Sequence, residues 1–179
     1  MMQKINEAVT YIKEQYNKQP LAGIVLGSGL GSFVNEIQVE KEISYSSIPN
    51  FPVSTVAGHS GKLVFGQLGG KTVVAMAGRF HFYEGYDAHE VIFPIRVMKL
   101  LGISTLLISN AAGSTNTSYA VGDLMIIKDH ISFFQPNPLI GKNITELGPR
   151  FPDMSEPYNR QLITKAKSIA AAENIKLRE

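Results

Sequence analysis

The segment GRFHFYEGYD at residues 78–87 concentrates side chains that could do chemistry. It follows the apolar run KTVVAMA and places Arg79, His81 and Glu84 among aromatic residues. An arginine guanidinium binds oxyanions through a fork of N–H donors, and a histidine can hold or transfer a proton near neutral pH. A solvated connection needs none of these groups, so the segment is interpreted as a binding loop.

Two further segments combine apolar runs with small residues that let the backbone approach an anion. GSGLG at 27–31 follows LAGIVL, and Ser28 adds a hydroxyl donor there. NAAG at 110–113 follows STLLIS. Ligands of α/β proteins collect at the carboxyl ends of strands, so these exits would offer their donors to one oxyanion. The convergence of the segments predicts a phosphate site.

Each glycine-rich segment also has a purely structural interpretation. A glycine-rich turn is usually only a turn, and GSGLG is a poor dinucleotide fingerprint because Ser32 occupies the position of the third glycine. GQLGGKT at 66–72 imitates a nucleotide-binding P-loop, but Phe65 stands where the first glycine is required. We therefore interpret residues 66–72 as part of a hairpin.

The histidines do not indicate a metal site. His81 and Glu84 have a spacing that could ligate a metal, yet no further ligands stand at matching positions. His89 and His130 receive no functional role, because a single histidine is more often structural. No metal is expected.

Alternating helices and strands are expected to position these residues. A helix is expected over residues 3–18, where apolar residues recur on one face until Pro20 ends it. The expected strands are LAGIVL, KLVFGQL, KTVVAMA, STLLIS and DLMIIKD. Gly69 and Gly70 would form a hairpin turn between the second and third of these.

Two more helices and one long loop complete the expected organisation. The run AHEVIFPIRVMKLLG has helical apolar spacing, and Pro94 should kink this helix or set its start. Another helix should begin near Ser155–Pro157, with Ser155 as its cap. Residues 133–157 have no periodicity, and a long ordered loop of this kind is often functional. The whole pattern predicts one α/β domain over residues 1–179 with a mixed sheet.

Composition excludes several classes of function. The 179 residues are 44% hydrophobic and 18% charged, as in a globular domain with a core. The net charge is only +2 and the basic residues are scattered, which disfavours nucleic-acid and membrane partners. The chain has no cysteine, and its first residues are amphipathic rather than signal-like, so we expect a cytoplasmic protein.

Six motifs, taken in chain order, resemble those of the trimeric purine nucleoside phosphorylases of the bacterial type. They are GSGLG, FPVSTVAGHSGKLVFG, GRFHFYEGY, SNAAG, VGDLMIIKDHI and GPRFPDMSEPY. The resemblance implies a phosphorylase/hydrolase-like, three-layer α/β/α fold with a central mixed sheet, and a homotrimer. It also implies phosphorolysis in purine salvage: phosphate attacks the anomeric carbon of a purine ribonucleoside or deoxyribonucleoside, giving free base and (deoxy)ribose 1-phosphate. No cofactor would be needed, since phosphate is a co-substrate.

The resemblance also implies roles for individual residues. Phosphate would be bound by Ser28, His59, Arg79, His81 and the backbone N–H of Ala111. The catalytic residues would be His81, Glu84 and His59, with Glu84 holding His81 in position, and Tyr83 would lie beside the ribose.

The chain departs from the family pattern at two places. Family chains continue beyond the position of Glu179, so the resemblance implies that the C-terminal part is lacking, with purine-binding Glu and Asn residues and another phosphate-binding Ser. Leu147 stands where many relatives carry a Phe that reaches the ribose site of the neighbouring subunit. Two alternatives stay open: a methylthioadenosine phosphorylase-like enzyme, and a truncated phosphate-binding remnant without turnover.

Overall fold

The computed structural model describes residues 1–52, 61–133 and 136–179. The chain forms two compact units, Met1–Ala111 and Ala112–Glu179. The single domain expected over residues 1–179 stays a prediction. The segments that were expected to bind phosphate all belong to the first unit, apart from the end of NAAG.

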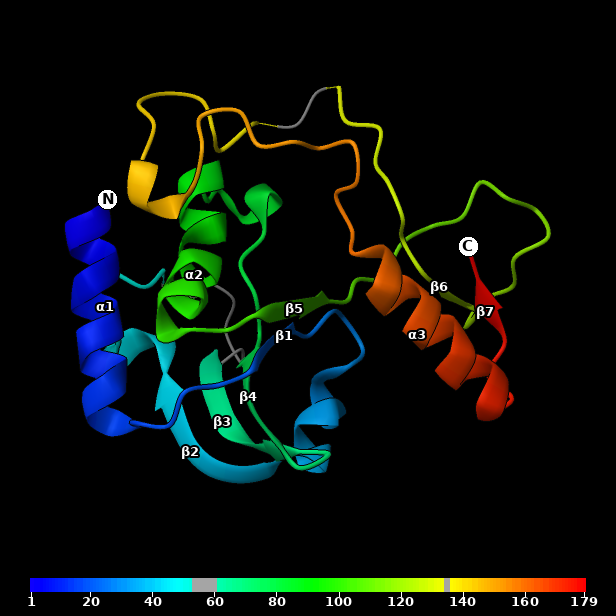
Figure 1. Cartoon of the computed structure of the whole chain (residues 1–179), viewed down its shortest axis with the longest axis horizontal. Helices are drawn as coiled ribbons and strands as arrows, with labels where there is room; N and C mark the ends of the chain where they lie inside the picture. The colour runs from blue at the N-terminus through cyan, green and yellow to red at the C-terminus, as the bar shows by residue number, and fades with distance from the viewer. Residues whose placement is uncertain (53–60, 134–135) are drawn as a thin grey trace. The chain divides into compact units, whose positions relative to one another are not determined.

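A five-stranded sheet in the order β2-β3-β4-β1-β5 forms the centre of the first unit (Figure 1). Its strands are β1 (Ala22–Val25), β2 (Gln38–Ser44), β3 (Lys62–Leu68), β4 (Lys71–Ala77) and β5 (Thr105–Ile108). Strands β2, β3 and β4 are antiparallel neighbours, whereas β1 pairs in parallel with both β4 and β5. The predicted mixed sheet is therefore confirmed. The sequence pattern missed β2, because Ile43 is the only buried residue of this edge strand.

The hairpin between β3 and β4 forms as predicted. Leu68 pairs with Lys71 across the turn, and Gly69 and Gly70 have φ angles of 54° and 71°. A two-residue turn with positive φ at both positions suits the right-handed twist of the strands, and glycine adopts it without steric cost. The segment that imitates a P-loop is thus an ordinary hairpin.

Helices α1 (Met2–Gln15) and α2 (Ala88–Leu101) pack against each other, side by side in Figure 1. Helix α1 ends before residue 18, because Tyr16 is extended and its ring packs 4.8 Å from that of Phe65. Pro94 lies inside α2 and does not set the start of this helix. The helix begins instead at a capping box, in which the Asp87 side chain accepts from Glu90 N and the Glu90 side chain accepts from Asp87 N.

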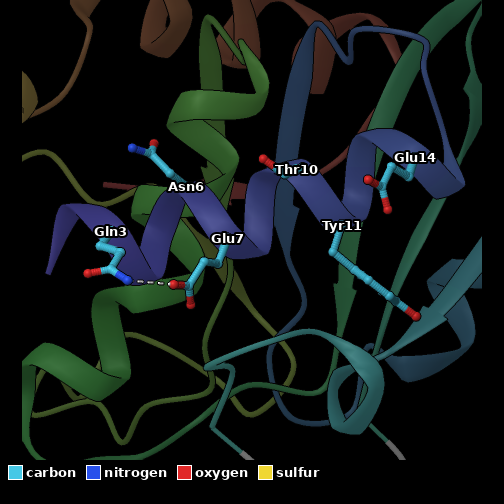
Figure 2. Close-up of a pocket in the computed structure, with 6 residues that line it drawn as sticks. All are labelled: Gln3, Asn6, Glu7, Thr10, Tyr11 and Glu14. Atoms are coloured by element: carbon cyan, nitrogen blue, oxygen red, sulfur yellow. Dashed lines mark hydrogen bonds between the residues drawn. The ribbon is translucent and has the colours of Figure 1, made fainter.

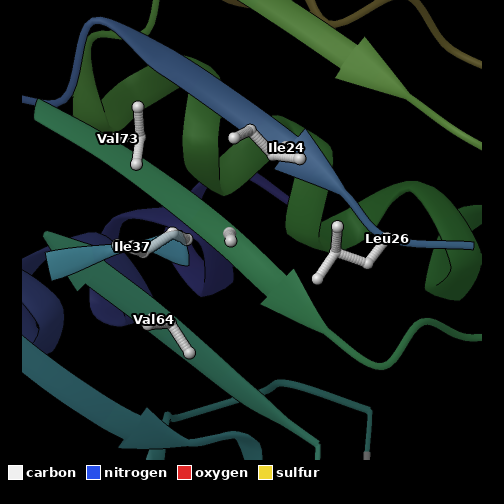
Figure 3. Close-up of a cluster of buried hydrophobic side chains, with 6 residues drawn as sticks. Ile24, Leu26, Ile37, Val64 and Val73 are labelled. Carbon is white, nitrogen blue, oxygen red and sulfur yellow. The ribbon is translucent and has the colours of Figure 1, made fainter. Parts of the chain in front are cut away.

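Strands β1, β3 and β4 at the centre of the sheet carry consecutive buried residues, so both of their faces are covered. One face carries a cluster of Ile24, Leu26, Ile37, Val64, Val73 and Ala75, shown in Figure 3. On the opposite face, a Cβ at Gly23 would lie 2.8 Å from Ile103 and 3.1 Å from Met98 of α2. This glycine therefore lets α2 approach β1 closely. Short 3₁₀ segments connect the elements of this unit: η1 (Gly31–Glu36), η2 (Tyr45–Ser47) and η3 (Phe82–Glu84).

The second unit contains helix α3 (Arg160–Ala172), a 3₁₀ segment η4 (Thr145–Leu147) and a two-stranded parallel sheet of β6 (Leu124–Met125) and β7 (Leu177–Arg178). The expected strand DLMIIKD shortens to two residues. The prediction of Ser155 as helix cap is wrong. Asn159 caps α3 by accepting from Leu162 N, while the Ser155 hydroxyl donates to Asp153. Within the ranges that the structure describes, no helix is long and apolar enough to cross a membrane.

Candidate functional site

The first strand exit is a tight turn that exposes Ser28. Leu30 N donates to the carbonyl of Gly27 over 3.1 Å, and Gly29 has a φ of 84° at the third position of the turn. A positive φ there is characteristic of a type II turn and favours glycine. Gly27 is buried, whereas Ser28 is exposed. The turn thus presents the serine hydroxyl at the end of β1.

The exits of β1 and β5 are in direct backbone contact. Gly27 N donates to the Ser109 hydroxyl over 2.9 Å. A Cβ at Gly27 would lie 2.6 Å from the carbonyl oxygen of Ser109 and 2.9 Å from Cα of Asn110. Backbone atoms at such distances cannot move aside as a flexible side chain can, so only glycine fits at position 27.

Arg79 connects the exit of β4 to that of β5. Gly78, with a φ of 100°, turns the chain away from β4, and Arg79 Nη1 then donates to the Ser109 carbonyl over 2.7 Å. Arg79 Nε donates to His81 Nε2 over 3.0 Å. A guanidinium has five N–H donors. Arg79 uses two of them in these bonds to described residues, which leaves further donors for an anion.

His81 lies between Arg79 and Glu84, and its hydrogen bonds define its tautomer. Because Arg79 Nε–H can only donate, Nε2 of the imidazole accepts and carries no proton in this arrangement. The ring proton is then on Nδ1, which contacts the Glu84 carboxylate. The Glu84 side chain is 9% exposed and that of His81 25% exposed. The carboxylate thus orients the imidazole.

Tyr83 stacks on this imidazole at the solvent side. The two ring centroids are 4.7 Å apart with an interplanar angle of 22°, and Tyr83 is 82% exposed. The 3₁₀ segment η3 carries Tyr83 and Glu84 on the same short turn, which ends at Gly85 with a φ of 97°. The loop therefore offers an exposed aromatic surface next to His81.

Of the two remaining candidates, Ala111 and His59, the structure describes only Ala111. Ala111 is exposed, two residues beyond the Ser109 carbonyl that accepts from Arg79. His59 lies outside the described residues. The structure therefore joins four candidates through consecutive contacts: Arg79, His81, Glu84 and Tyr83. Ser109 contacts both Arg79 and Gly27, the residue before Ser28, and so links the first turn to this group. The roles assigned to these residues stay predictions.

Two residues of this region were missed by sequence reasoning. Ser109 ends the expected strand STLLIS and begins the SNAAG motif, but neither pattern assigns it a role, although a hydroxyl at a strand exit is a signal for one. Tyr45 stands in no motif, yet its hydroxyl donates to the Gly78 carbonyl over 2.7 Å and its backbone N–H donates to Gly61 O over 2.9 Å. Tyr45 is 3% exposed, and burial raises the pKa of its phenol. It anchors the residue that precedes Arg79.

We expect Tyr45→Phe to lower the free energy of unfolding by about 1 to 2 kcal/mol, because the Gly78 carbonyl would lose its donor in a part-buried place. Urea denaturation monitored by circular dichroism measures this difference. Tyr11→Phe is the matched control, since Tyr11 lies on the outer face of α1 (Figure 2) and is only partly buried. Equal stability of the two variants would contradict the anchoring role of Tyr45.

Other polar features of the chain do not coincide with these residues. An open hollow on α1 is lined by Gln3, Asn6, Glu7, Thr10, Tyr11 and Glu14, all from one helix (Figure 2). In the second unit His130 Nε2 contacts the Tyr158 hydroxyl. Residues 1–52, 61–133 and 136–179 contain no group of three or more His, Cys, Asp and Glu side chains arranged to hold a metal.

Comparison with known proteins gives a consistent set of relatives. The model of the phosphorylase superfamily matches residues 22–179. Purine nucleoside phosphorylase 1 of Geobacillus stearothermophilus is 54% identical over 175 residues, covering 98% of this chain and 64% of that protein. Purine nucleoside phosphorylase 1 of Bacillus subtilis (strain 168) is 50% identical over 179 residues, covering 100% of this chain and 66% of that protein. The chain thus spans just under two thirds of the length of these relatives.

Solved structures agree with this result. Isoform 2 of purine nucleoside phosphorylase from Schistosoma mansoni, in complex with cytosine and ribose-1-phosphate, aligns with a TM-score of 0.92 and 48% identity, covering 99% of this chain and 64% of that one. Another purine nucleoside phosphorylase from Schistosoma mansoni, in complex with acetate, aligns with a TM-score of 0.93 and 42% identity, covering 99% and 67%. The predicted phosphorylase/hydrolase-like α/β/α fold is confirmed.

Proposed function

Because this chain belongs to the phosphorylase superfamily, we propose that it acts as a purine nucleoside phosphorylase, a pentosyltransferase. Its reaction would be the phosphorolysis of purine ribonucleosides or deoxyribonucleosides to free base and (deoxy)ribose 1-phosphate. The observation that carries the proposal is the meeting of three strand exits at Ser109, with Arg79 and His81 beside them. The purine nucleoside phosphorylase identity of the bacterial relatives supports the choice of substrate.

Capture of phosphate is the first task of such a site. Arg79 binds an anion without removing its charge, because guanidinium stays protonated and donates from a fixed fork. Exposed Ser28 and the exposed backbone at Ala111 would add neutral donors from the two neighbouring strand exits. A phosphate held in this way keeps an oxygen that can attack.

The reacting sugar develops positive charge when its N-glycosidic bond breaks. A phosphate dianion held below the ring both attacks the anomeric carbon and stabilises this charge. Nε2 of His81 accepts from Arg79 Nε in the structure, and on binding phosphate it would exchange this bond for one to the anion. Oriented by Glu84, the imidazole can accept or donate through Nε2 and so would adapt to either protonation state of the phosphate. The exposed ring of Tyr83 would lie against the ribose. The reaction uses no cofactor, and phosphate is a co-substrate.

The departing purine also needs a proton or a hydrogen bond, because it otherwise leaves with negative charge. We place the groups for this step in the roughly one third of the bacterial relatives that the matched region does not span. A homotrimer in the cytoplasm completes the proposal, on the resemblance to the trimeric enzymes.

The test is an assay of the purified protein with inosine and phosphate. Intact mass comes first, because 19.6 kDa identifies the polypeptide of 179 residues. Release of hypoxanthine that depends on added phosphate is the expected result for the enzyme with its complete base-binding part. Phosphate-independent release, or no release by a full-length protein, contradicts the proposal.

Two alternatives give different outcomes in the same experiment. A methylthioadenosine phosphorylase-like enzyme would release adenine from methylthioadenosine in preference to hypoxanthine from inosine. A phosphate-binding protein without turnover would show a calorimetric signal with phosphate and no base release. The second alternative has a specific argument, since the three strand exits and the His81–Glu84 contact all lie within Met1–Ala111.

Ser28→Ala is expected to weaken phosphate binding by about 1 kcal/mol, because it removes one neutral donor while the charged ligand stays in place. Calorimetric titration of the variant with inorganic phosphate measures the change. Ser32→Ala provides the control, since Ser32 is also exposed but lies beyond the turn, in η1. An unchanged phosphate affinity in Ser28→Ala would leave Ser28 with a structural role only.

A further inference from the structure

Ser109 makes polar contacts with two other strand exits at once. Its hydroxyl donates to the Val25 carbonyl over 3.1 Å and accepts from Gly27 N over 2.9 Å. Its backbone N–H also donates to the Val25 carbonyl over 3.1 Å. Its own carbonyl accepts from Arg79 Nη1 over 2.7 Å. One residue therefore joins the end of β1 to Arg79, the second residue after β4.

The hydroxyl of Ser109 replaces a strand-to-strand hydrogen bond that the sheet no longer supplies. Strand β1 ends at Val25 and strand β5 at Ile108, so Gly27 N lies past the last backbone pair between them. Gly27 is buried, and a buried N–H without a partner is costly. A hydroxyl can donate and accept at the same time, which lets Ser109 serve Val25 and Gly27 together.

The carbonyl of Ser109 fixes the guanidinium in the same frame. The backbones at Gly27 and Ser109 are so close that a Cβ at Gly27 would lie 2.6 Å from this carbonyl oxygen. The oxygen is thus held by the packing of two strand exits, and Arg79 donates to it from the third. Any shift between the β1 and β5 exits would move Ser28 relative to Arg79.

We propose that Ser109 is a positioning residue for phosphate, which holds the Gly27–Ser28 turn in register with the Arg79 guanidinium. This inference rests on the proposed function. Ser109 acts through Gly27, Val25 and Arg79 and need not touch phosphate. A hydroxyl at position 109 is therefore required for phosphate affinity rather than for nucleoside affinity.

The experiment compares three variants by titration with inorganic phosphate and by KM values in the inosine assay. Ser109→Ala removes the hydroxyl and is expected to weaken phosphate binding about tenfold, with the KM for inosine changed less than about twofold. Ser109→Thr keeps a hydroxyl and should restore phosphate affinity to within about threefold of the parent. Ser104→Ala is the matched control, since Ser104 stands just before β5 and its hydroxyl donates to the Leu21 carbonyl over 3.2 Å.

If Ser109→Ala fails to fold, Ser109→Cys takes its place, because a thiol of similar size is a weaker donor and acceptor. This variant should bind phosphate less tightly than Ser109→Thr. Phosphate affinity equal to the parent in the folded variant, or equal weakening for phosphate and inosine, overturns the inference.

Measurements on the parent protein distinguish failure of the Ser109 inference from failure of the proposed function. A parent that binds phosphate, with Ser109 variants that bind it equally well, refutes the positioning role alone. A parent that neither binds phosphate nor releases hypoxanthine refutes both. A parent that binds phosphate without releasing base leaves the titration with phosphate as the deciding measurement for Ser109.

Discussion

Arg79→Ala is expected to abolish most of the affinity for inorganic phosphate while changing the affinity for inosine little. Loss of a charged hydrogen-bond partner from a desolvated site costs about 2 to 5 kcal/mol, which is roughly 30-fold or more in affinity. Arg79 also donates to Ser109 O and His81 Nε2, so its loss would free both of these acceptors and loosen the imidazole. Separate calorimetric titrations with phosphate and with inosine measure the two affinities.

Arg160→Ala is the control for removal of an arginine. Its side chain is 75% exposed and pairs with Glu156 of the preceding turn at 2.7 Å. Exposed pairs of this kind contribute about 0 to 1 kcal/mol to stability, and Arg160 belongs to no candidate site. Phosphate affinity of this variant should equal that of the parent. If Arg79→Ala lowered the two affinities equally, the assignment of Arg79 to phosphate would be wrong.

Gly27→Ala is expected to lower the free energy of unfolding by about 3 kcal/mol, because the added methyl group would overlap backbone atoms of the two residues that follow β5. The nearest atoms are the carbonyl oxygen of Ser109 at 2.6 Å, its carbonyl carbon at 2.8 Å and Cα of Asn110 at 2.9 Å. Relief of this overlap requires the β1 and β5 exits to separate, which would break the bond from Gly27 N to the Ser109 hydroxyl. Phosphate affinity should therefore fall together with stability. Urea denaturation and phosphate titration measure the two effects.

The matched control is Gly31→Ala, four residues later. A Cβ at Gly31 would meet no atom within 4 Å, and its φ is not in the left-handed region. Its free energy of unfolding should stay within about 0.5 kcal/mol of the parent, as for surface substitutions away from special features. A Gly27→Ala variant as stable as Gly31→Ala would show that the two strand exits can separate without cost.

Much of the first unit follows from local sequence patterns. The helical face of α1, the apolar runs of β1, β3 and β4, and the paired glycines between β3 and β4 each depend on neighbouring residues only. Strand β2 could not be found in this way, because an edge strand with only Ile43 buried has no apolar run. The cap of α3 at Asn159 instead of Ser155 reflects competition between nearby polar residues, since Asp153 engages Ser155.

The candidate site, like the fold, could be predicted only in part from the sequence. By itself the sequence determined which residue types follow each strand, and from these it predicted an anion site formed by Ser28, Arg79, His81 and the NAAG segment. Only the tertiary structure decided that these exits meet at Ser109, because the bonds that join them link residues 82 and 30 positions apart. Whether a hydroxyl or a guanidinium points at a partner depends on the pairing of β1 with β4 and β5. That pairing results from packing the whole sheet, and no local pattern encodes it.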